Sequence, residues 1–515
     1  MNTEWFSQAI LTAYSAVLGL LCVYGLHRLF LVMTFYRVRR QPPPPKGSFA
    51  QPPAVTVQLP MYNERYVAAR VIEAACRIDY PRERLEIQVL DDSTDETREI
   101  ALGTVERLRA GGHNVVYLHR GDRTGYKAGA LEAGTKVARG EFIAVFDADF
   151  LPPPNILRET IDHFTDPRVG LVQCRWEHLN RDDSLLTRVQ AVLLDGHFLI
   201  EHTARNRTDR YMSFNGTAGI WRRAAIEDAG GWQHDTLTED LDLSYRAQLR
   251  GWRFVFLPEL TAPAELPPEI NAFKAQQHRW TKGGAQTCVK LLPRVLREAC
   301  DWRIKLEAFF HLTSGAVYVL MVLLSLLIGP ALLMKLLTEA EPSFGQLAVD
   351  FTLFLIGTGS ALSFYIASQR QLLRRWRDIL PCIPALMALG IGIALNNAVA
   401  AVDGLFRRAG EFVRTPKFGQ APRGAAGGRP RLAAFRVRGW WKACAELALA
   451  LYLLTFLLSL FFFDKWVERV SAALPFLGIF IFGYLYVACQ TFYGLWLASR
   501  RSPLVPQTLS SGPVV

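Results

Sequence analysis

Long apolar stretches flank one large block of mixed polarity along the 515-residue chain. Six stretches contain no Asp, Glu, Lys or Arg: residues 9–26, 308–334, 351–369, 379–402, 447–463 and 470–499. Each is near or above the ~17–25 residues that a helix needs to cross a bilayer. One stretch lies near the start and five lie in the second half, so the pattern predicts an integral membrane protein with a polar domain inserted between membrane helices.

The first apolar stretch predicts a retained anchor rather than a cleaved signal peptide. The residues before it carry Glu4 and no cation, and no small-residue cleavage site precedes the basic run 37–40. Basic flanks of membrane helices stay in the cytoplasm. We therefore expect residues 41–307 to lie in the cytosol.

The charges of the later loops favour five crossings plus one segment that lies along the membrane interface. A crossing by residues 379–402 would place the basic stretch 403–446 outside, against the positive-inside bias. The same segment contains Pro381 and Pro384, which make it a poorer spanning helix than its neighbours. We expect 379–402 to be the interfacial segment, and six crossings is the alternative.

The block between the anchors predicts an α/β domain with a largely parallel sheet. A proline-rich linker precedes it, and short apolar runs then alternate with helical patterns. The runs are Val55–Leu59, Glu86–Leu90, Val115–Leu118, Phe142–Phe146 and Gly170–Cys174. Ligands of such sheets bind at the carboxyl ends of the strands.

The composition favours a membrane protein and disfavours nucleic-acid binding, a disulfide framework and a structural zinc site. Half of the residues are apolar, and 58 Lys and Arg against 47 Asp and Glu give a net charge of +11. The excess cations lie mostly beside the apolar stretches, which favours attraction to membrane lipids over nucleic-acid binding. The eight cysteines are scattered and form no CxxC pair, so we expect neither a disulfide framework nor a structural zinc site.

Acidic motifs follow the predicted strands. Asp92 lies after the second strand, although Ser93–Glu96 there is also a capping box for the next helix. Asp147 and Asp149 follow the fourth strand, and two such carboxylates can hold a hard divalent cation that binds a diphosphate. An acidic turn ended by prolines is the structural alternative. Asp240 opens a later helix, where Thr236 and Glu239 also form a capping box.

The run Gln276-Gln277-His278-Arg279-Trp280 combines a guanidinium fork suited to phosphate with an aromatic platform suited to a sugar face. An ordinary amphipathic helix that enters the membrane is the alternative. The stretch 121–127 lacks the Walker spacing, which excludes a nucleoside triphosphatase of that type.

Taken in order, the motifs DDS, GYKAGAL, DAD, FNGTAGIW, TED and QQHRW resemble the signature of family 2 membrane glycosyltransferases. The resemblance is closest to cellulose-synthase-like enzymes, especially plant glucomannan or mannan synthases and their bacterial relatives. It covers residues 54–300 strongly and the membrane part more loosely. It implies a GT-A (Rossmann-like) catalytic domain, a nucleotide-sugar donor, and Mg²⁺ or Mn²⁺ as cofactor.

The resemblance also implies a role for each motif residue. Asp240 would be the general base, and Asp147 and Asp149 would bind the metal. The implied donor-binding residues are Asp92, Lys127, Asp147 and Arg279. The implied acceptor-binding residues are Trp280, Gln276, Asn215, Gly216, Thr217 and Glu239. A gating-like loop would contain Phe412, Val413, Thr415 and Lys417, although Arg414 and Pro416 interrupt the family pattern.

These residue types fit an inverting transfer. A carboxylate takes the proton of an acceptor hydroxyl as that hydroxyl attacks the anomeric carbon, and one displacement turns an α-linked donor into a β-linked product. The metal, Lys127 and Arg279 stabilise the departing diphosphate. A two-carboxylate hydrolase is disfavoured, because the motifs supply a cation clamp rather than an acid of raised pKa.

We expect a processive hexosyltransferase that uses UDP-glucose or GDP-mannose and exports a β-linked polysaccharide through the plasma or inner membrane. The alternative is transfer of one hexose to a lipid such as ceramide, diacylglycerol or polyprenyl phosphate. A transporter or scaffold is disfavoured, because the apolar stretches carry few charges. The expected divisions are the anchor 1–40, linker 41–53, catalytic domain 54–300, two membrane helices 301–378, interfacial segment and gating-like loop 379–441, two membrane helices 442–502, and tail 503–515.

Overall fold

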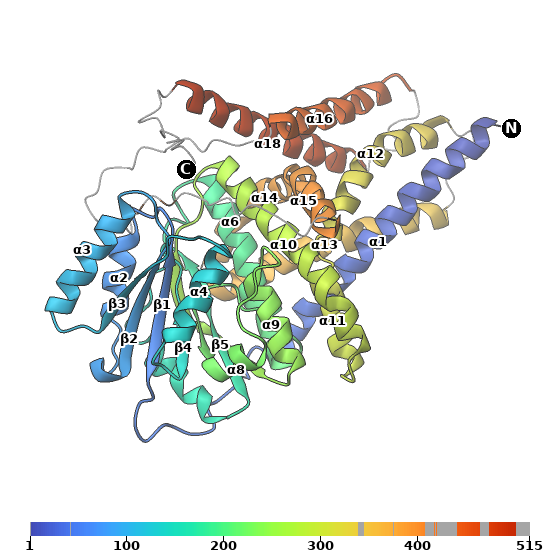
Figure 1. Ribbon diagram of the computed structural model, residues 1–515. Coiled ribbons are helices and arrows are strands. Elements are labelled where there is room, and N and C mark those ends of the chain that lie inside the picture. The colour runs from blue at the N-terminus through green and yellow to red at the C-terminus, as the bar shows by residue number, and fades with distance from the viewer. Residues whose placement is uncertain are drawn as a thin grey trace, which may run out of the picture.

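The computed structural model describes residues 2–41, 43–337, 344–373, 375–406, 417, 419, 440–463 and 473–500. An α/β domain lies beside a group of long apolar helices (Figure 1). The helix α1 (Asn2–Val38) precedes this domain in the chain, and the other apolar helices follow it. This order confirms a domain inserted between helices of membrane-spanning length and composition.

A seven-stranded sheet forms the centre of the α/β domain, in the order β3-β2-β1-β4-β6-β5-β7. Its strands are β1 (Val55–Met61), β2 (Leu85–Asp91), β3 (Val115–His119), β4 (Phe142–Val145), β5 (Val169–His178), β6 (Gly219–Arg222) and β7 (Arg253–Ala264). Only β6 runs antiparallel to its neighbours β4 and β5. The largely parallel sheet is confirmed, and each of the five predicted apolar runs overlaps a strand.

Helices cover both faces of the sheet, which explains why every residue of β1 and β2 is buried. The helical elements of the domain are α2 (Ala68–Cys76), η1 (Arg82–Arg84), α3 (Thr97–Ala110), α4 (Tyr126–Val137), α5 (Ile156–Thr160), η2 (Ile161–Thr165), α6 (Leu185–Asp195), η3 (Gly196–His202), α7 (Thr203–Arg207), α8 (Arg223–Asp228), α9 (Glu239–Leu249) and α10 (Ile270–Arg297). One core packs α2 and α3 against the sheet, and a second core packs α4, α8 and α9.

The strand order brings the acidic motifs together. β1 pairs with β2 on one side and with β4 on the other, all three parallel. Asp92 follows the end of β2, and Asp147 lies just beyond the end of β4. Both motifs therefore lie at the same edge of the sheet.

The apolar part contains α11 (Trp302–Leu312), α12 (Ala316–Leu337), α13 (Phe344–Leu372), η4 (Trp376–Cys382), α14 (Ile383–Gly392), α15 (Ala394–Phe406), α16 (Trp440–Leu460) and α18 (Leu474–Arg500). Among the described residues, five segments are long and apolar enough to cross a membrane: Trp5–Val38, Ala316–Leu337, Trp376–Phe406, Trp440–Leu460 and Leu474–Leu497.

The number of candidate spans equals the predicted number of crossings, but the set differs. Residues 376–406, which contain the predicted interfacial segment, are among the five candidates, whereas α13 is not. The former stretch is broken into a 3₁₀ turn and two helices, with Pro381 inside the turn. Which of these segments crosses the membrane stays a prediction.

Helix α10 lies between the sheet and the apolar helices in Figure 1. A buried ion pair connects it to α16: Lys274 Nζ lies 2.7 and 2.8 Å from the two carboxylate oxygens of Glu446 and 3.2 Å from Thr491 Oγ1 of α18. A second pair joins Lys282 Nζ to Asp403 Oδ2 at 2.6 Å. The helix that carries the QQHRW motif is thus attached to the apolar helices by charge as well as by packing.

Replacing Lys274 with Met should lower the free energy of unfolding by about 3–5 kcal/mol, because the buried Glu446 carboxylate loses its partner. Thermal and denaturant unfolding of the full chain in detergent measures this change. The double variant Lys274→Met/Glu446→Met should recover most of the loss, since it removes both charges. A double variant as unstable as the single one would contradict this account.

Candidate active site

Lys127, at the start of α4, lies at the meeting point of three sequence motifs. Its Nζ lies 2.5 Å from Asp147 Oδ1 and donates a hydrogen bond of 2.9 Å to the carbonyl oxygen of Gly216. The Asp147 backbone N–H donates to Thr217 Oγ1 at 2.9 Å. The GYK, DAD and FNGT motifs are therefore in direct contact, as their shared assignment to one site requires.

The backbone around Lys127 is held in uncommon conformations. Gly216 has φ of 80°, and a Cβ atom there would lie 2.9 Å from Asp240 Oδ2 and 3.2 Å from Lys127 Nζ. Tyr126 and Ala218 also have positive φ, 49° and 55°, although neither is glycine. Such residues cost of order 1–3 kcal/mol each and cluster at functional sites, so the local strain marks this place in the fold.

Asp240, at the first turn of α9, is the best candidate for a general base. Its Oδ1 accepts a hydrogen bond of 2.8 Å from the Leu241 N–H. Burial raises the pKa of Asp240 to about 7; the charge of Glu239 adds to this rise and that of Lys127 opposes it. A carboxyl group that titrates near neutral pH suits proton transfer at physiological pH.

Arg279 of α10 faces the acidic residues of the sheet edge. Burial lowers the pKa of its guanidinium, whereas the charges of Glu239, Asp147, Asp240 and Asp149 raise it. All four carboxylates are therefore near enough to act on one cation. Asp240 and Asp149, which lie far apart in the sequence, share this part of the molecule.

A cavity of about 870 Å³ reaches this cluster at Asp240. Asp240, Asn215, Gln276 and Trp280 all line it. The Trp280 ring centroid lies 6.4 Å from that of Trp176, so two aromatic side chains are near each other in the cavity wall. The site thus joins a cluster of charged groups to a wall with aromatic faces.

Asp92 has a partner that the sequence motifs did not reveal. Arg120 binds it through two contacts, Nε to Oδ1 at 2.8 Å and Nη2 to Oδ2 at 2.5 Å. Arg120 also donates to the backbone carbonyl groups of Thr124 and Tyr126. The pair therefore connects the end of β2 to the loop before Lys127. Arg120 follows β3 directly, and this position is the only feature of the sequence that indicates its role.

Neither of the capping boxes that the sequence allowed is formed. Helix α3 begins at Thr97 and α9 at Glu239, and neither N-cap residue makes a side-chain capping hydrogen bond. The Ser93 hydroxyl instead accepts the Asn63 N–H at 2.8 Å, and the Thr236 hydroxyl donates to the Thr238 carbonyl. At the start of α3 the Thr97 N–H donates instead to Asp95 Oδ1 at 3.0 Å.

Asp149 contacts the segment that follows α15. Lys417 Nζ lies 2.5 Å from Asp149 Oδ2. Lys417 is the last residue of the predicted gating-like loop, and Phe412, Val413 and Thr415 of that loop lie outside the described residues. One end of the loop is therefore adjacent to the DAD motif.

The DAD motif offers two carboxylates, Asp147 and Asp149, to a metal ion. Within the described part of the chain, no group of three or more His, Cys, Asp or Glu side chains could hold a metal ion by itself. Asp147 and Asp149 nevertheless each pair with an ammonium group at 2.5 Å, so both carboxylates present an oxygen to a cation. Mg²⁺ is commonly held by one or two carboxylates together with substrate phosphates, and this donor set fits that pattern.

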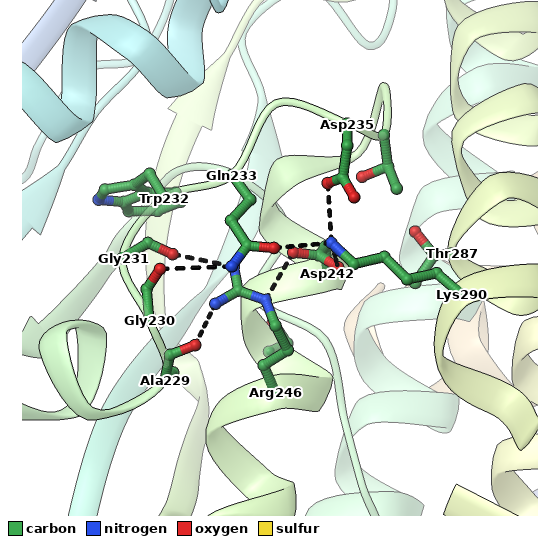
Figure 2. A network of polar contacts seen from close by, with 12 residues as sticks. Ala229, Gly230, Gly231, Trp232, Gln233, Asp235, Asp242, Arg246, Thr287 and Lys290 are labelled. Carbon is green, nitrogen blue, oxygen red and sulfur yellow. Dashed lines mark hydrogen bonds and ion pairs between the residues drawn. The ribbon is translucent and has the colours of Figure 1, made fainter. Parts of the chain in front are cut away.

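The loop 229–238 before Asp240 is held by a network of polar contacts (Figure 2). Arg246 of α9 binds the buried Asp242 carboxylate with its Nε at 2.7 Å. Its two terminal nitrogens donate to the carbonyl groups of Ala229 and Gly231. The spacing of Asp242 and Arg246 predicts this pair on one helix face, but not its hold on the loop.

Lys290 of α10 completes the network from the other side, as Figure 2 shows. Its Nζ lies 2.8 Å from Gln233 Oε1, 2.7 Å from Asp235 Oδ1 and 2.8 Å from Asp242 Oδ1. No sequence motif pointed to Lys290, because its partners come from a loop and helix about 50 residues earlier. The network fixes the entry into the TED motif against α10.

Comparison with known proteins agrees with this geometry. Residues 52–283 match the family model described as "Glycosyltransferase like family 2". Glucomannan 4-beta-mannosyltransferase 2 of Arabidopsis thaliana is 47% identical over 250 residues, which are 48% of this chain and 47% of that protein. Glucomannan 4-beta-mannosyltransferase 1 of Oryza sativa subsp. japonica is 45% identical over 252 residues, 48% of each chain. The matched part thus spans about half the length of these relatives.

A solved mannosyltransferase from Pyrobaculum calidifontis, in complex with GDP-Man and Mn²⁺, has a similar fold. It covers 78% of this chain and 99% of its own, with a TM-score of 0.50 and 21% sequence identity. The α/β domain therefore has the GT-A fold of nucleotide-sugar glycosyltransferases. Residues 52–283 thus match a family 2 glycosyltransferase model and are similar to the plant glucomannan mannosyltransferases, as the order of the motifs predicted.

Replacing Arg246 with Met should lower the free energy of unfolding by about 3 kcal/mol, because a buried carboxylate and two carbonyl groups lose a charged donor. Thermal unfolding measures the loss, and limited proteolysis should show faster cleavage within residues 229–238. The control Arg250→Met changes an exposed arginine of the same helix end and should stay within about 0.5 kcal/mol. Equal effects of both changes would contradict a role of the network.

Proposed function

We propose that this protein is an inverting, metal-dependent mannosyltransferase that extends a β-linked polysaccharide from GDP-mannose. The observation that carries the proposal is Asp240, a carboxyl group with a pKa near 7 that lies beside Lys127 and lines the same cavity as Trp280. The mannose donor is preferred over UDP-glucose because the relatives at 45–47% identity are named 4-beta-mannosyltransferases.

The donor would bind at the sheet edge. Asp147 and Asp149 would hold Mg²⁺ or Mn²⁺, which when bound supplies positive charge to the diphosphate. Lys127 and Arg279 stabilise the charge that develops on the leaving nucleoside diphosphate. Asp92, fixed by Arg120, contributes to the nucleotide pocket at the end of β2.

The acceptor would bind in the cavity. Trp280 offers a flat apolar face to the sugar ring, and Gln276 and Asn215 offer polar groups to its hydroxyls. Gly216, Thr217 and Glu239 shape the place where acceptor and donor meet. Asp240 accepts the proton of the attacking hydroxyl while the bond between the anomeric carbon and the diphosphate breaks, and this single displacement inverts the configuration.

The course of the cavity favours polymer export over transfer to a lipid. From Asp240 it continues past Tyr14 of α1, Met321 of α12, Leu386 of α14 and Phe480 of α18. Those four helices belong to four of the five candidate membrane spans. A cavity that leads from the reacting groups into the membrane helices suits a chain that leaves through them. In this proposal the catalytic domain faces the cytosol, where the nucleotide sugar is available.

Membranes containing the full chain should convert GDP-mannose with Mn²⁺ into a long, 4-linked polymer that a β-mannanase degrades. UDP-glucose alone should give little product, and EDTA should abolish synthesis until Mn²⁺ is added back. Linkage analysis and size-exclusion chromatography measure product type and length. Radiolabel found only as single sugars on solvent-extractable lipid would refute polymer synthesis and favour the lipid acceptor.

The change Asp240→Asn should lower kcat/KM by about 10²- to 10⁴-fold, because the amide cannot accept the hydroxyl proton. For the unaltered protein, kcat/KM should rise with pH up to about 7 and then level off, since the base acts in its deprotonated form. Binding of Mn²⁺, followed by electron paramagnetic resonance, should be unchanged. Glu106→Gln, on an exposed position of α3, is the matched control. An Asp240→Asn variant that retains activity would exclude the base role.

A further inference from the structure

A π-helical segment interrupts the helix that borders the cavity. The segment η3 (Gly196–His202) continues α6 and leads into α7. Its first residue packs against α13, because a Cβ at Gly196 would lie 2.3 Å from the Phe364 ring. The π geometry is rare and occurs often at functional sites. None of its residues has a role in the transfer reaction proposed above.

A continuous chain of polar contacts starts at Asn215 and runs through the π segment. Asn215 Nδ2 donates to His197 Nε2 at 3.0 Å, and His197 Nδ1 lies 2.9 Å from Glu201 Oε2. Because Nε2 accepts a hydrogen bond, Nδ1 carries the proton and donates it to the carboxylate. Glu201 Oε2 also lies 3.4 Å from Arg205 Nη1.

The chain continues into the N-terminal helix. Arg205 Nε lies 2.9 Å from Glu307 Oε1, and Glu307 Oε2 lies 3.1 Å from His27 Nε2 of α1. Arg205 and Glu307 are almost completely buried, with 3% and 2% of their side chains exposed. Arg205 lines the cavity with little exposed surface and Glu307 does not line it, so both residues mainly support the network.

Arg205 and His27 line the cavity with only 3% and 12% of their side chains exposed, whereas more of Glu201 and His197 is exposed. Their side chains retain 20% and 30% exposure, and both line the cavity together with Arg28. Burial would raise the pKa of Glu201, but the charge of Arg205, the hydrogen bond from His197 and the charge of Arg28 outweigh it and hold the pKa well below its ordinary value. The carboxylate is thus ionised and presents hydrogen-bond acceptors to whatever enters the cavity.

The charge balance indicates which chemical class of ligand fits. The guanidinium groups of Arg28 and Arg205 are matched by the carboxylates of Glu201 and Glu307, so the cluster has no excess of positive charge. A phosphate headgroup would need an excess of cations. An uncharged, hydroxyl-rich chain suits ionised acceptors and donors beside aromatic walls, and Phe198 and Tyr318 line the same cavity.

We propose that the π segment forms a second acceptor subsite, in which the Glu201 carboxylate binds hydroxyls of a sugar residue already added to the chain. His197 is a positioning residue that links this carboxylate to Asn215. The inference rests on the proposed polysaccharide synthesis and specifies the part of the cavity that recognises an uncharged, multi-residue acceptor.

The test compares two primers, β-1,4-mannobiose and β-1,4-mannohexaose, with the full chain in detergent and GDP-mannose as donor. The unaltered protein should have a lower KM for the hexaose. Glu201→Gln should raise the KM for the hexaose about tenfold or more, with the KM for the biose and for GDP-mannose nearly unchanged, because a neutral amide replaces a charged acceptor. His197→Gln should cause a smaller loss of the same kind. Glu227→Gln, in the exposed Arg223–Glu227 pair of α8, is the matched control and should change nothing.

The outcomes separate the two proposals. If the unaltered protein elongates both primers but Glu201→Gln keeps the preference for the hexaose, the subsite is refuted and the proposed function stands. The subsite is equally refuted if both variants raise all KM values alike, since Glu201 and His197 would then act only on folding. If the unaltered protein transfers mannose to lipid and to neither primer, polysaccharide synthesis itself fails and the subsite fails with it.

Discussion

Carboxylates from separate elements converge on one ammonium group, and the candidate active site depends on this convergence. Burial alone would lower the pKa of Lys127, but Asp147, Glu239 and Asp240 raise it, so the lysine remains charged. Without that cation the acidic side chains at the sheet edge would repel one another. Lys127 also donates to the Gly216 carbonyl, so the same charge orders the loop that faces Asp240.

The charge of Lys127 also helps to set the pKa of Asp240. Its carboxyl group is near a like charge, Glu239, and near an opposite one, Lys127, and its pKa of about 7 is the balance of burial and these fields. A base must release its proton readily and yet be able to take one from a sugar hydroxyl. Burial alone, or a lysine alone, would move the pKa away from this range.

Helix α10 connects the α/β domain to the apolar helices. It presents Arg279 to the acidic cluster and Trp280 to the cavity, while Lys274 pairs with Glu446 in α16. The same helix thus contacts both the candidate site and the apolar helices. The polar chain from Asn215 to His27 makes a second connection of this kind, from the loop that contains Asn215 to α1.

The sequence by itself determined the fold class and predicted members of the candidate site. Alternation of short apolar runs with helical patterns predicted the parallel sheet, because strands covered on both faces are rich in apolar residues. Ordered motifs identified Asp147, Asp240 and Arg279, since these residues are spaced along the chain as in the family. Tertiary structure alone decided the partners of these residues. Arg120, Lys290 and the π-helical Glu201 have no motif, and their roles arise from contacts between segments that lie far apart in sequence. The strand β6 and the divided segment 376–406 also depended on packing. Gly219–Arg222 begins with glycine and ends with arginine, so it shows no apolar run, and apolar composition alone does not distinguish a crossing helix from a broken one.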